Sequence, residues 1–308
     1  MIKRTLYFGN PAYLSLANGQ LVITKPDDGD LPLDDAPRQV RTIPIEDIGV
    51  VVLDNRQLTV TSGLMEHLLE NNVAVITCDA HSMPSGLLLP LEGNTLQQER
   101  FTDQLEASLP LRKQLWQQTV SAKIENQAGM LKYANGEDAR NMIIWANQVK
   151  SGDSENMEAR AASFYWKNVF RELPFFVRGR YEAPPNNLLN YGYAILRGIM
   201  ARSLVASGLL PTMGIHHHNR YNAYCLADDI MEPYRPFVDR IVFDYCSDNE
   251  NWAPTLSLEA KSALLKLPVA DVFIDGHKSP LMIAATATTS SLAKCFSGEK
   301  RQLVYPEF

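Results

Sequence analysis

The chain has few cysteines, no long hydrophobic run and no excess of positive charge. Its four cysteines stand too far apart for a Cys-x-x-Cys zinc motif, which argues against zinc-finger chemistry and favours reduced thiols. The longest apolar runs, such as 87–91, are much shorter than the roughly 20 residues that a transmembrane helix needs. The first residues lack the apolar stretch and the cleavage site of a signal peptide. We therefore expect a cytoplasmic protein with no membrane partner.

The net charge of −6 argues against a general nucleic-acid-binding protein, whose surface is usually basic. Affinity for phosphates depends on where the cations lie, however, and several cations fall within one stretch. These are Arg160, Lys167, Arg171, Arg178 and Arg180. The acidic residues concentrate elsewhere, at 27–35 and 92–106. The stretch is therefore either a basic face on an acidic molecule or the ordinary solvated surface of a helix.

The first part of the chain has the pattern of a β domain. Short runs of β-branched and aromatic residues alternate with turn residues, and Asn18-Gly19 is a strong hairpin signal. The pattern predicts strands over 5–8, 13–16, 20–24, 41–45, 48–53, 57–61, 73–77 and 85–89, with one short helix over 62–71. Five aspartates, three prolines and one glycine within 25–37 predict an exposed loop.

From about residue 96 the pattern becomes helical. Apolar residues recur at helical spacing over 96–109, 112–133, 138–150, 154–171, 188–207, 223–235, 257–267 and 283–296. The chain is long enough for two domains. We predict an α+β protein with a small N-terminal β domain over 1–92 and an all-α helical C-terminal domain over 93–308.

A segment rich in histidine and acid stands out in the helical part. Residues 214–236 contain the consecutive histidines His216, His217 and His218. The predicted helix 223–235 then places Asp229 and Glu232 three residues apart, on one face. A loop of histidines that leads into a helix with two stacked carboxylates is typical of half a metal site.

A third acid lies on the predicted helix 154–171. Glu158 falls beside the apolar stripe that includes Met157, Ala161 and Tyr165. A carboxylate at the edge of a buried face is either an ordinary surface acid or a ligand. From the pattern alone both interpretations stay open.

Four segments together resemble one known family. They are 2–8, 45–49, 186–194 and 227–236, and their order and spacing are specific in combination. On these segments the chain resembles, over nearly its whole length, the CRISPR-associated integrase in its type II form, the larger of the two universal adaptation proteins. The resemblance implies an N-terminal β domain and a C-terminal α-helical catalytic domain.

The resemblance also implies which residues bind metal. The family ligands are a glutamate on a helix, a histidine that closes a Gly-x-x-His element, and an acid in the following helix. They correspond to Glu158, His217 and Glu232, with Asp229 as a nearby supporting acid. Many family members carry one histidine where this chain has three. His216 and His218 are then flanking support or DNA contacts, although a register shift by one residue is an open alternative.

The family reaction is a phosphodiester exchange. The 3′-hydroxyl of a short DNA fragment attacks a phosphodiester at the boundary of a CRISPR repeat, and two such transesterifications insert a spacer. A divalent cation polarises the phosphate and stabilises the leaving oxyanion. Two carboxylates and one imidazole suit Mg²⁺ or Mn²⁺. The resemblance therefore implies a metal-dependent integrase that also has endonuclease activity.

The resemblance further implies protein and DNA partners. The family integrase is a homodimer, and two dimers flank one dimer of the smaller adaptation protein on double-stranded DNA. In type II systems the RNA-guided effector nuclease and a further adaptation subunit take part in spacer selection. Arg160, Lys167, Arg171, Arg178, Arg180 and Arg220 are candidate phosphate contacts. Tyr165, Trp166 and Tyr191 are candidates either for stacking on bases or for core packing.

Two other functions compete with the integrase. One is a metal-dependent hydrolase of small phosphate substrates that uses the same three ligands. The other is a non-catalytic DNA-binding scaffold with a degenerate site. The presence of Glu158, His217 and Glu232 argues against the scaffold.

Overall fold

The computed structural model describes residues 3–25, 40–173, 176–179, 181–248 and 255–308. The chain divides into two compact units, 1–91 and 92–308. Most of the loop predicted over 25–37 lies outside the described residues, as does Arg180. In the part of the chain that the structure describes, no helix is both long enough and apolar enough to cross a membrane.

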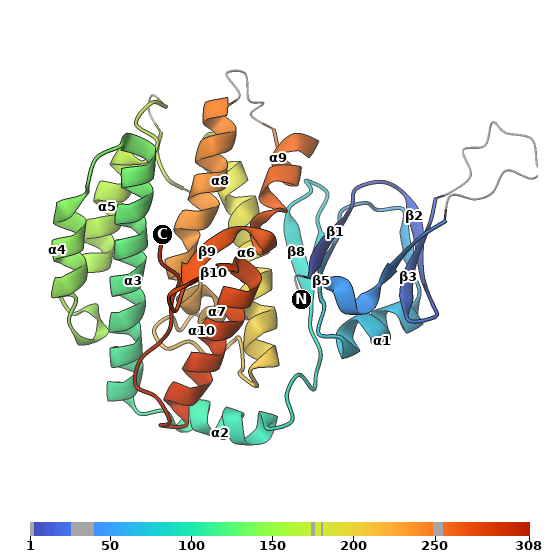
Figure 1. Cartoon of the computed structure of the whole chain (residues 1–308), viewed down its shortest axis with the longest axis horizontal. Helices are drawn as coiled ribbons and strands as arrows, with labels where there is room; N and C mark the ends of the chain where they lie inside the picture. Colours follow the sequence, from blue (N-terminus) through green and yellow to red (C-terminus); the bar gives the residue numbers. More distant parts are fainter. Residues whose placement is uncertain (1–2, 26–39, 174–175, 180, 249–254) are drawn as a thin grey trace, which may run out of the picture. The chain divides into compact units, whose positions relative to one another are not determined.

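The N-terminal unit consists of two four-stranded sheets and one helix (Figure 1). One sheet has the order β1-β5-β7-β8 and the other the order β4-β3-β2-β6. The elements are β1 (Arg4–Phe8), β2 (Ala12–Ala17), β3 (Gln20–Thr24), β4 (Val40–Pro44), β5 (Ile48–Leu53), β6 (Leu58–Val60), α1 (Ser62–Glu70), β7 (Ala74–Cys78) and β8 (Pro84–Leu88). The hairpin predicted at Asn18-Gly19 is confirmed, because both residues have positive φ and connect the antiparallel strands β2 and β3.

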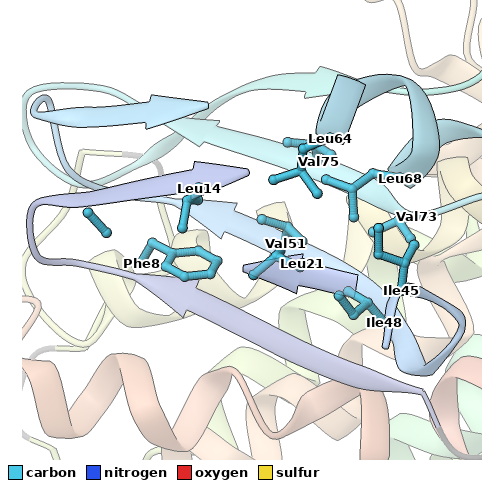
Figure 2. Close-up of a cluster of buried hydrophobic side chains, with 11 residues drawn as sticks. Phe8, Leu14, Leu21, Ile45, Ile48, Val51, Leu64, Leu68, Val73 and Val75 are labelled. Atoms are coloured by element: carbon cyan, nitrogen blue, oxygen red, sulfur yellow. The ribbon is translucent and has the colours of Figure 1, made fainter. Parts of the chain in front are cut away.

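The core of this unit lies between the two sheets and α1 (Figure 2). Leu14 and Leu21 point into it from one sheet, and Val51 and Val75 from the other. Leu64 and Leu68 of α1 pack into the same cluster. The inner strand β5 is buried along most of its length, as the continuous apolar run from Val50 to Leu53 predicts.

The C-terminal unit is mainly helical, so the predicted α+β class is confirmed. Its helices are α2 (Gln97–Glu106), α3 (Leu109–Asn135), α4 (Arg140–Gln148), α5 (Met157–Asn168), α6 (Asn186–Ala206), α7 (Cys225–Ile230), α8 (Arg235–Asp248), α9 (Leu258–Leu264) and α10 (Leu281–Phe296). The long helix α3 packs against α4, α5 and α8, and α6 packs against α8 and α10 (Figure 1). Ser108 caps the start of α3, and Gly136 ends it in the left-handed conformation.

Two features of this unit differ from the prediction. The domain is not all-α, because β9 (Asp271–Ile274) and β10 (His277–Pro280) form an antiparallel hairpin. The helix predicted over 223–235 is broken. It ends at Ile230, continues as the 3-10 turn η3 (Glu232–Tyr234), and is followed by α8. Pro233 causes the break because it has no N–H group for an α-helical hydrogen bond.

Candidate active site

Glu158 is held in the first turn of α5 by the aspartate that precedes the helix. Asp153 accepts hydrogen bonds from the backbone N–H of Met157 at 2.8 Å and of Glu158 at 3.0 Å. The residue before the helix, Asn156, has a positive φ of 55°. A carboxylate in the first turn is favoured by the helix dipole. The capping therefore fixes both the start of α5 and the position of Glu158, whose side chain is only partly exposed.

Glu232 stands at the break between α7 and α8 and is almost fully buried. Its Oε1 accepts a hydrogen bond of 2.8 Å from Nε of Arg235, and its Oε2 lies 2.6 Å from Nζ of Lys123. Burial alone would raise the pKa of this carboxyl group, but the charges of Arg235 and Lys123 lower the pKa to about 2. Glu232 is therefore a carboxylate at neutral pH.

Lys123 on α3 joins the two glutamates. Its Nζ lies 2.6 Å from Oε1 of Glu158 as well as 2.6 Å from Oε2 of Glu232. The lysine is buried, so the ammonium is shielded from water and depends on these carboxylates for its partners. Burial alone would lower the pKa of Lys123, but the charges of Glu232 and Glu158 raise it. The structure thus brings Glu158 and Glu232 together around one positive charge.

His217 is oriented by Asp229, which is completely buried on α7. The Asp229 carboxylate accepts hydrogen bonds from the backbone N–H groups of His216 and His217 and is hydrogen-bonded to the His217 ring at Nδ1. That ring hydrogen bond raises the pKa of His217, to which the charges of Glu232 and Glu158 also contribute. With Nδ1 engaged, Nε2 is the ring nitrogen that can bind a cation.

The tight turn before His217 requires glycine. A Cβ atom on Gly214 would lie 2.4 Å from the carbonyl oxygen of His217 and 2.8 Å from Oδ2 of Asp229. Any side chain there would push the histidine loop away from the aspartate. The structure thus gives a steric reason for a glycine three residues before the histidine in the Gly-x-x-His element.

The three histidines have three different environments. The ring of His216 stacks on Trp116 at 4.2 Å between centroids, with an interplanar angle of 2°. Burial and the neighbouring His217 lower the pKa of His216. His217 contacts the same Trp116 edge-on at 5.6 Å. His218 is exposed. Of the three, His217 is the histidine whose ring is hydrogen-bonded to the buried Asp229.

Asp229 and Glu232 have separate partners, although the sequence predicts that they share a helix face. The break after Ile230 separates them, so Asp229 contacts the histidine loop while Glu232 contacts Lys123 and Arg235. Within the described residues, no three His, Cys, Asp or Glu side chains are grouped so that they could hold a metal ion. Two glutamate oxygens nevertheless meet at one cation, and their chemistry suits Mg²⁺ or Mn²⁺. The two carboxylates therefore supply the oxygen donors that a divalent cation prefers, but among the described residues no third ligand is grouped with them, and Lys123 occupies the position between them.

The predicted phosphate contacts are placed very differently from one another. Arg160 and Lys167 are exposed on α5, but the helical rotation turns both to the side opposite Glu158. Arg171 is exposed and pairs with Glu172 at 3.4 Å. Arg220 is exposed in the loop after the histidines, where its guanidinium lies 4.6 Å from the ring centre of Tyr221.

Arg178 is engaged inside the fold. It donates hydrogen bonds of 2.9 Å to the side-chain oxygens of Asn186 and Asn190, and its guanidinium lies 5.4 Å from the ring centre of Tyr193. These contacts hold the segment before α6 against that helix. Arg178 therefore has a structural role that accounts for its position.

The aromatic candidates lie mostly in the core. Tyr165 and Tyr191 are fully buried, and Trp166 is half-buried against Tyr165. Tyr165 donates a hydrogen bond of 2.6 Å to Asp239, which also accepts one from Tyr193. Tyr165, Tyr193 and Asp239 thus form a buried polar cluster, and the guanidinium of Arg235, which pairs with Glu232, lies 4.5 Å from the ring centre of Tyr193. The exposed aromatic residue beside the histidines is Tyr221.

Sequence reasoning missed Lys123, Arg235 and Trp116. Lys123 follows Trp116 and Val120 at helical spacing, so it falls on the apolar face of α3. A lysine on such a face needs an anionic partner, so its position in the sequence could have predicted a buried ion pair. Arg235 follows Glu232 by three residues, which is the spacing of an ion pair within one helix.

Comparison with known proteins identifies the family. The family model of CRISPR associated protein Cas1 matches residues 6–266. The chain belongs to the Cas1 family. It is 34% identical over its whole length to the CRISPR-associated endonuclease Cas1 of Neisseria meningitidis serogroup C (strain 8013), covering 97% of that protein.

Two solved structures show the same fold as this Cas1 family member. A casposase bound to integration product is similar with a TM-score of 0.77 and 20% identity, over 98% of this chain and 92% of the casposase chain. A Cas6-RT-Cas1–Cas2 complex contains a chain with a TM-score of 0.72 and 20% identity. The match covers 98% of this chain and 36% of that longer one. At these identities the likeness concerns the fold, and the family assignment rests on the sequence match.

Proposed function

We propose that this chain is a metal-dependent DNA integrase of CRISPR adaptation, of the type II form, with endonuclease activity. The observation that carries the proposal is the convergence of Glu158 and Glu232 on one cation position in a member of the Cas1 family. The reaction proposed is a transesterification in which the 3′-hydroxyl of a spacer DNA displaces the 3′-oxygen at a phosphodiester of the repeat. One phosphodiester bond forms as another breaks, and the attacking hydroxyl proton passes to the leaving oxygen or to solvent.

The ligands proposed for Mg²⁺ or Mn²⁺ are Glu158, His217 and Glu232. When bound, the ion would supply Lewis-acid stabilisation of the phosphate and the leaving oxyanion. The chain's own groups prepare the site for this role. Arg235 holds Glu232 in place, and Asp229 fixes the His217 ring so that Nε2 is the nitrogen available as a ligand. Asp153 keeps Glu158 in the first turn of α5.

The experiment is the joining of labelled DNA ends to a supercoiled plasmid that carries a CRISPR repeat, with Mn²⁺ or Mg²⁺. Glu158→Gln, Glu232→Gln and His217→Ala should each lower joining by at least about a hundredfold, as does the loss of groups that stabilise charge in a transition state. Chelation by EDTA should abolish it. The casposase bound to integration product has the same fold, which makes joining the appropriate readout.

Two matched variants control for the loss of charge and of imidazole. Glu155→Gln removes a nearby glutamate that pairs with Lys150 on the surface, and His277→Ala removes an exposed histidine on β10, outside the histidine loop. Both should join DNA normally. Normal joining by Glu232→Gln and His217→Ala would instead refute the metal ligands. Turnover of small phosphate esters without DNA joining would favour the hydrolase, and DNA binding without either activity would favour the scaffold.

The proposed assembly follows the family. One solved neighbour is a complex that contains Cas1 and Cas2. We propose that this chain forms a homodimer and that two dimers flank one dimer of the smaller adaptation protein on double-stranded DNA. The RNA-guided effector nuclease and a further adaptation subunit are proposed as additional partners. Light scattering of the purified chain, alone and mixed with the smaller protein, would measure both stoichiometries.

A further inference from the structure

Lys123 occupies the space between the two carboxylates that are proposed to bind metal. Its Nζ lies within 2.6 Å of one oxygen of Glu158 and one oxygen of Glu232, and the three side chains come from α3, α5 and η3. The lysine is 8% exposed. An ammonium has three N–H donors, two of which these oxygens accept. Three separate elements are thus connected through one buried positive charge.

The charges at this position balance without any added ion. Glu158 and Glu232 carry two negative charges, and Lys123 and Arg235 carry two positive charges in direct contact with them. Burial makes an unpaired charge costly, which explains why the carboxylates are accompanied by cations. A divalent ion placed beside the ammonium would meet a site that is already neutral and a positive charge at close range. The ammonium and the divalent ion therefore compete for the same two oxygens.

We propose that Lys123 is a resident counter-cation of the Glu158–Glu232 pair, and that a divalent metal ion binds the pair only when the Lys123 ammonium leaves the space between the two carboxylates. This inference rests on the proposed metal-binding function. Lys123 keeps the carboxylates converged in the metal-free protein and weakens metal binding in the absence of DNA. Its flexible four-carbon side chain allows the ammonium to swing aside without unfolding α3.

The test is Mn²⁺ binding to the full-length protein without DNA, measured by titration calorimetry. Lys123→Met keeps an unbranched side chain but removes the charge. We expect Lys123→Met to bind Mn²⁺ about tenfold or more tightly than the wild type, which corresponds to about 1.4 kcal/mol or more. The thermal unfolding midpoint of the variant should be lower than that of the wild type in EDTA, and it should rise more steeply with added Mn²⁺.

Lys132→Met is the matched control. Lys132 lies on the same helix, but it is exposed and pairs with Asp138 at 2.9 Å. Its removal should leave Mn²⁺ affinity unchanged. Mn²⁺ affinity of Lys123→Met equal to or weaker than that of the wild type would overturn the inference and leave the metal ligands standing. If neither protein bound Mn²⁺, the proposed metal function would fail, and this inference with it.

A second measurement covers the case in which Lys123→Met does not fold. Crystals of the wild-type protein grown with Mn²⁺ locate the ion by its anomalous scattering. We expect Nζ of Lys123 to have moved out of hydrogen-bonding distance of at least one of the two glutamates. A bound Mn²⁺ with Nζ still bridging Glu158 and Glu232 would overturn the inference without any variant.

Discussion

At the scale of single residues, Asp239 is a second buried carboxyl group with an unusual environment. It lies on α8, is almost fully buried, and accepts hydrogen bonds from Tyr165 and Tyr193. Burial raises its pKa to about 6, even though both tyrosine hydrogen bonds and the nearby Arg235 and Arg178 act in the opposite direction. Desolvation therefore outweighs the favourable polar contacts, and the folded protein holds this proton into the mildly acidic range.

This pKa predicts a specific dependence of stability on pH. In the unfolded chain Asp239 releases its proton near pH 4, whereas in the folded chain it does so near pH 6, so the folded state binds more protons between these values. The contribution to the free energy of unfolding is fully present below about pH 4 and is lost as pH rises to about 6, by about 2 to 3 kcal/mol. Asp239→Asn cannot titrate. Urea unfolding of both proteins at pH 4.5 and pH 7.5 measures the difference.

The stability of the wild type relative to Asp239→Asn should fall as pH rises. Any constant offset from the altered hydrogen bonds with Tyr165 and Tyr193 cancels in this comparison. A relative stability that stayed level, or that rose with pH, would show that Asp239 is ionised in the folded protein throughout this range.

At the scale of the elements, α6 and α8 approach each other closely at a glycine. A Cβ atom on Gly192 would lie 2.4 Å from Cγ1 of Val238 on α8 and 3.0 Å from Cδ2 of Leu264 on α9. Gly192→Ala should therefore destabilise the protein by about 1 to 3 kcal/mol, as overpacking in a core does. Gly63→Ala on α1 is the control, because nothing lies within 4 Å of its Cβ position, and it should be neutral or stabilise by up to about 1 kcal/mol. Thermal unfolding of both variants tests the contrast, and equal midpoints would argue against the close approach.

Hydrophobic periodicity predicted most of the elements but not where the main chain breaks. The helical pattern of 223–235 continues through Pro233, yet the backbone turns there and α8 follows as a separate helix. Pro236 then fits in the first turn of α8, where a missing N–H has no cost. The β9–β10 hairpin was missed although its turn is Asp275-Gly276, a hairpin signal of the same kind as Asn18-Gly19. Its strands are only four residues long, which is too short for a clear alternation.

At the scale of the whole molecule, the candidate site is assembled from residues that no local pattern connects. The resemblance singled out Glu158, His217 and Glu232, but no sequence pattern places Lys123 between two of them. That position depends on how α3 packs against α5 and η3, which is a property of the tertiary structure. Which cations contact DNA also depends on the tertiary structure, because a net charge of −6 does not tell which cations lie beside the site.

The placement of the cations predicts which of them contact DNA. Arg220 is exposed beside the histidine loop, together with the exposed ring of Tyr221, whereas Lys167 lies on the face of α5 opposite Glu158. Arg220→Ala should weaken binding of a duplex oligonucleotide for all sequences and reduce the slope of log affinity against log salt concentration by about 1. Lys167→Ala removes one charge as well but should leave the slope unchanged. Fluorescence anisotropy over a series of salt concentrations measures both slopes. A reduced slope for Lys167→Ala with a normal slope for Arg220→Ala would place the DNA on the opposite side of α5, away from the carboxylates.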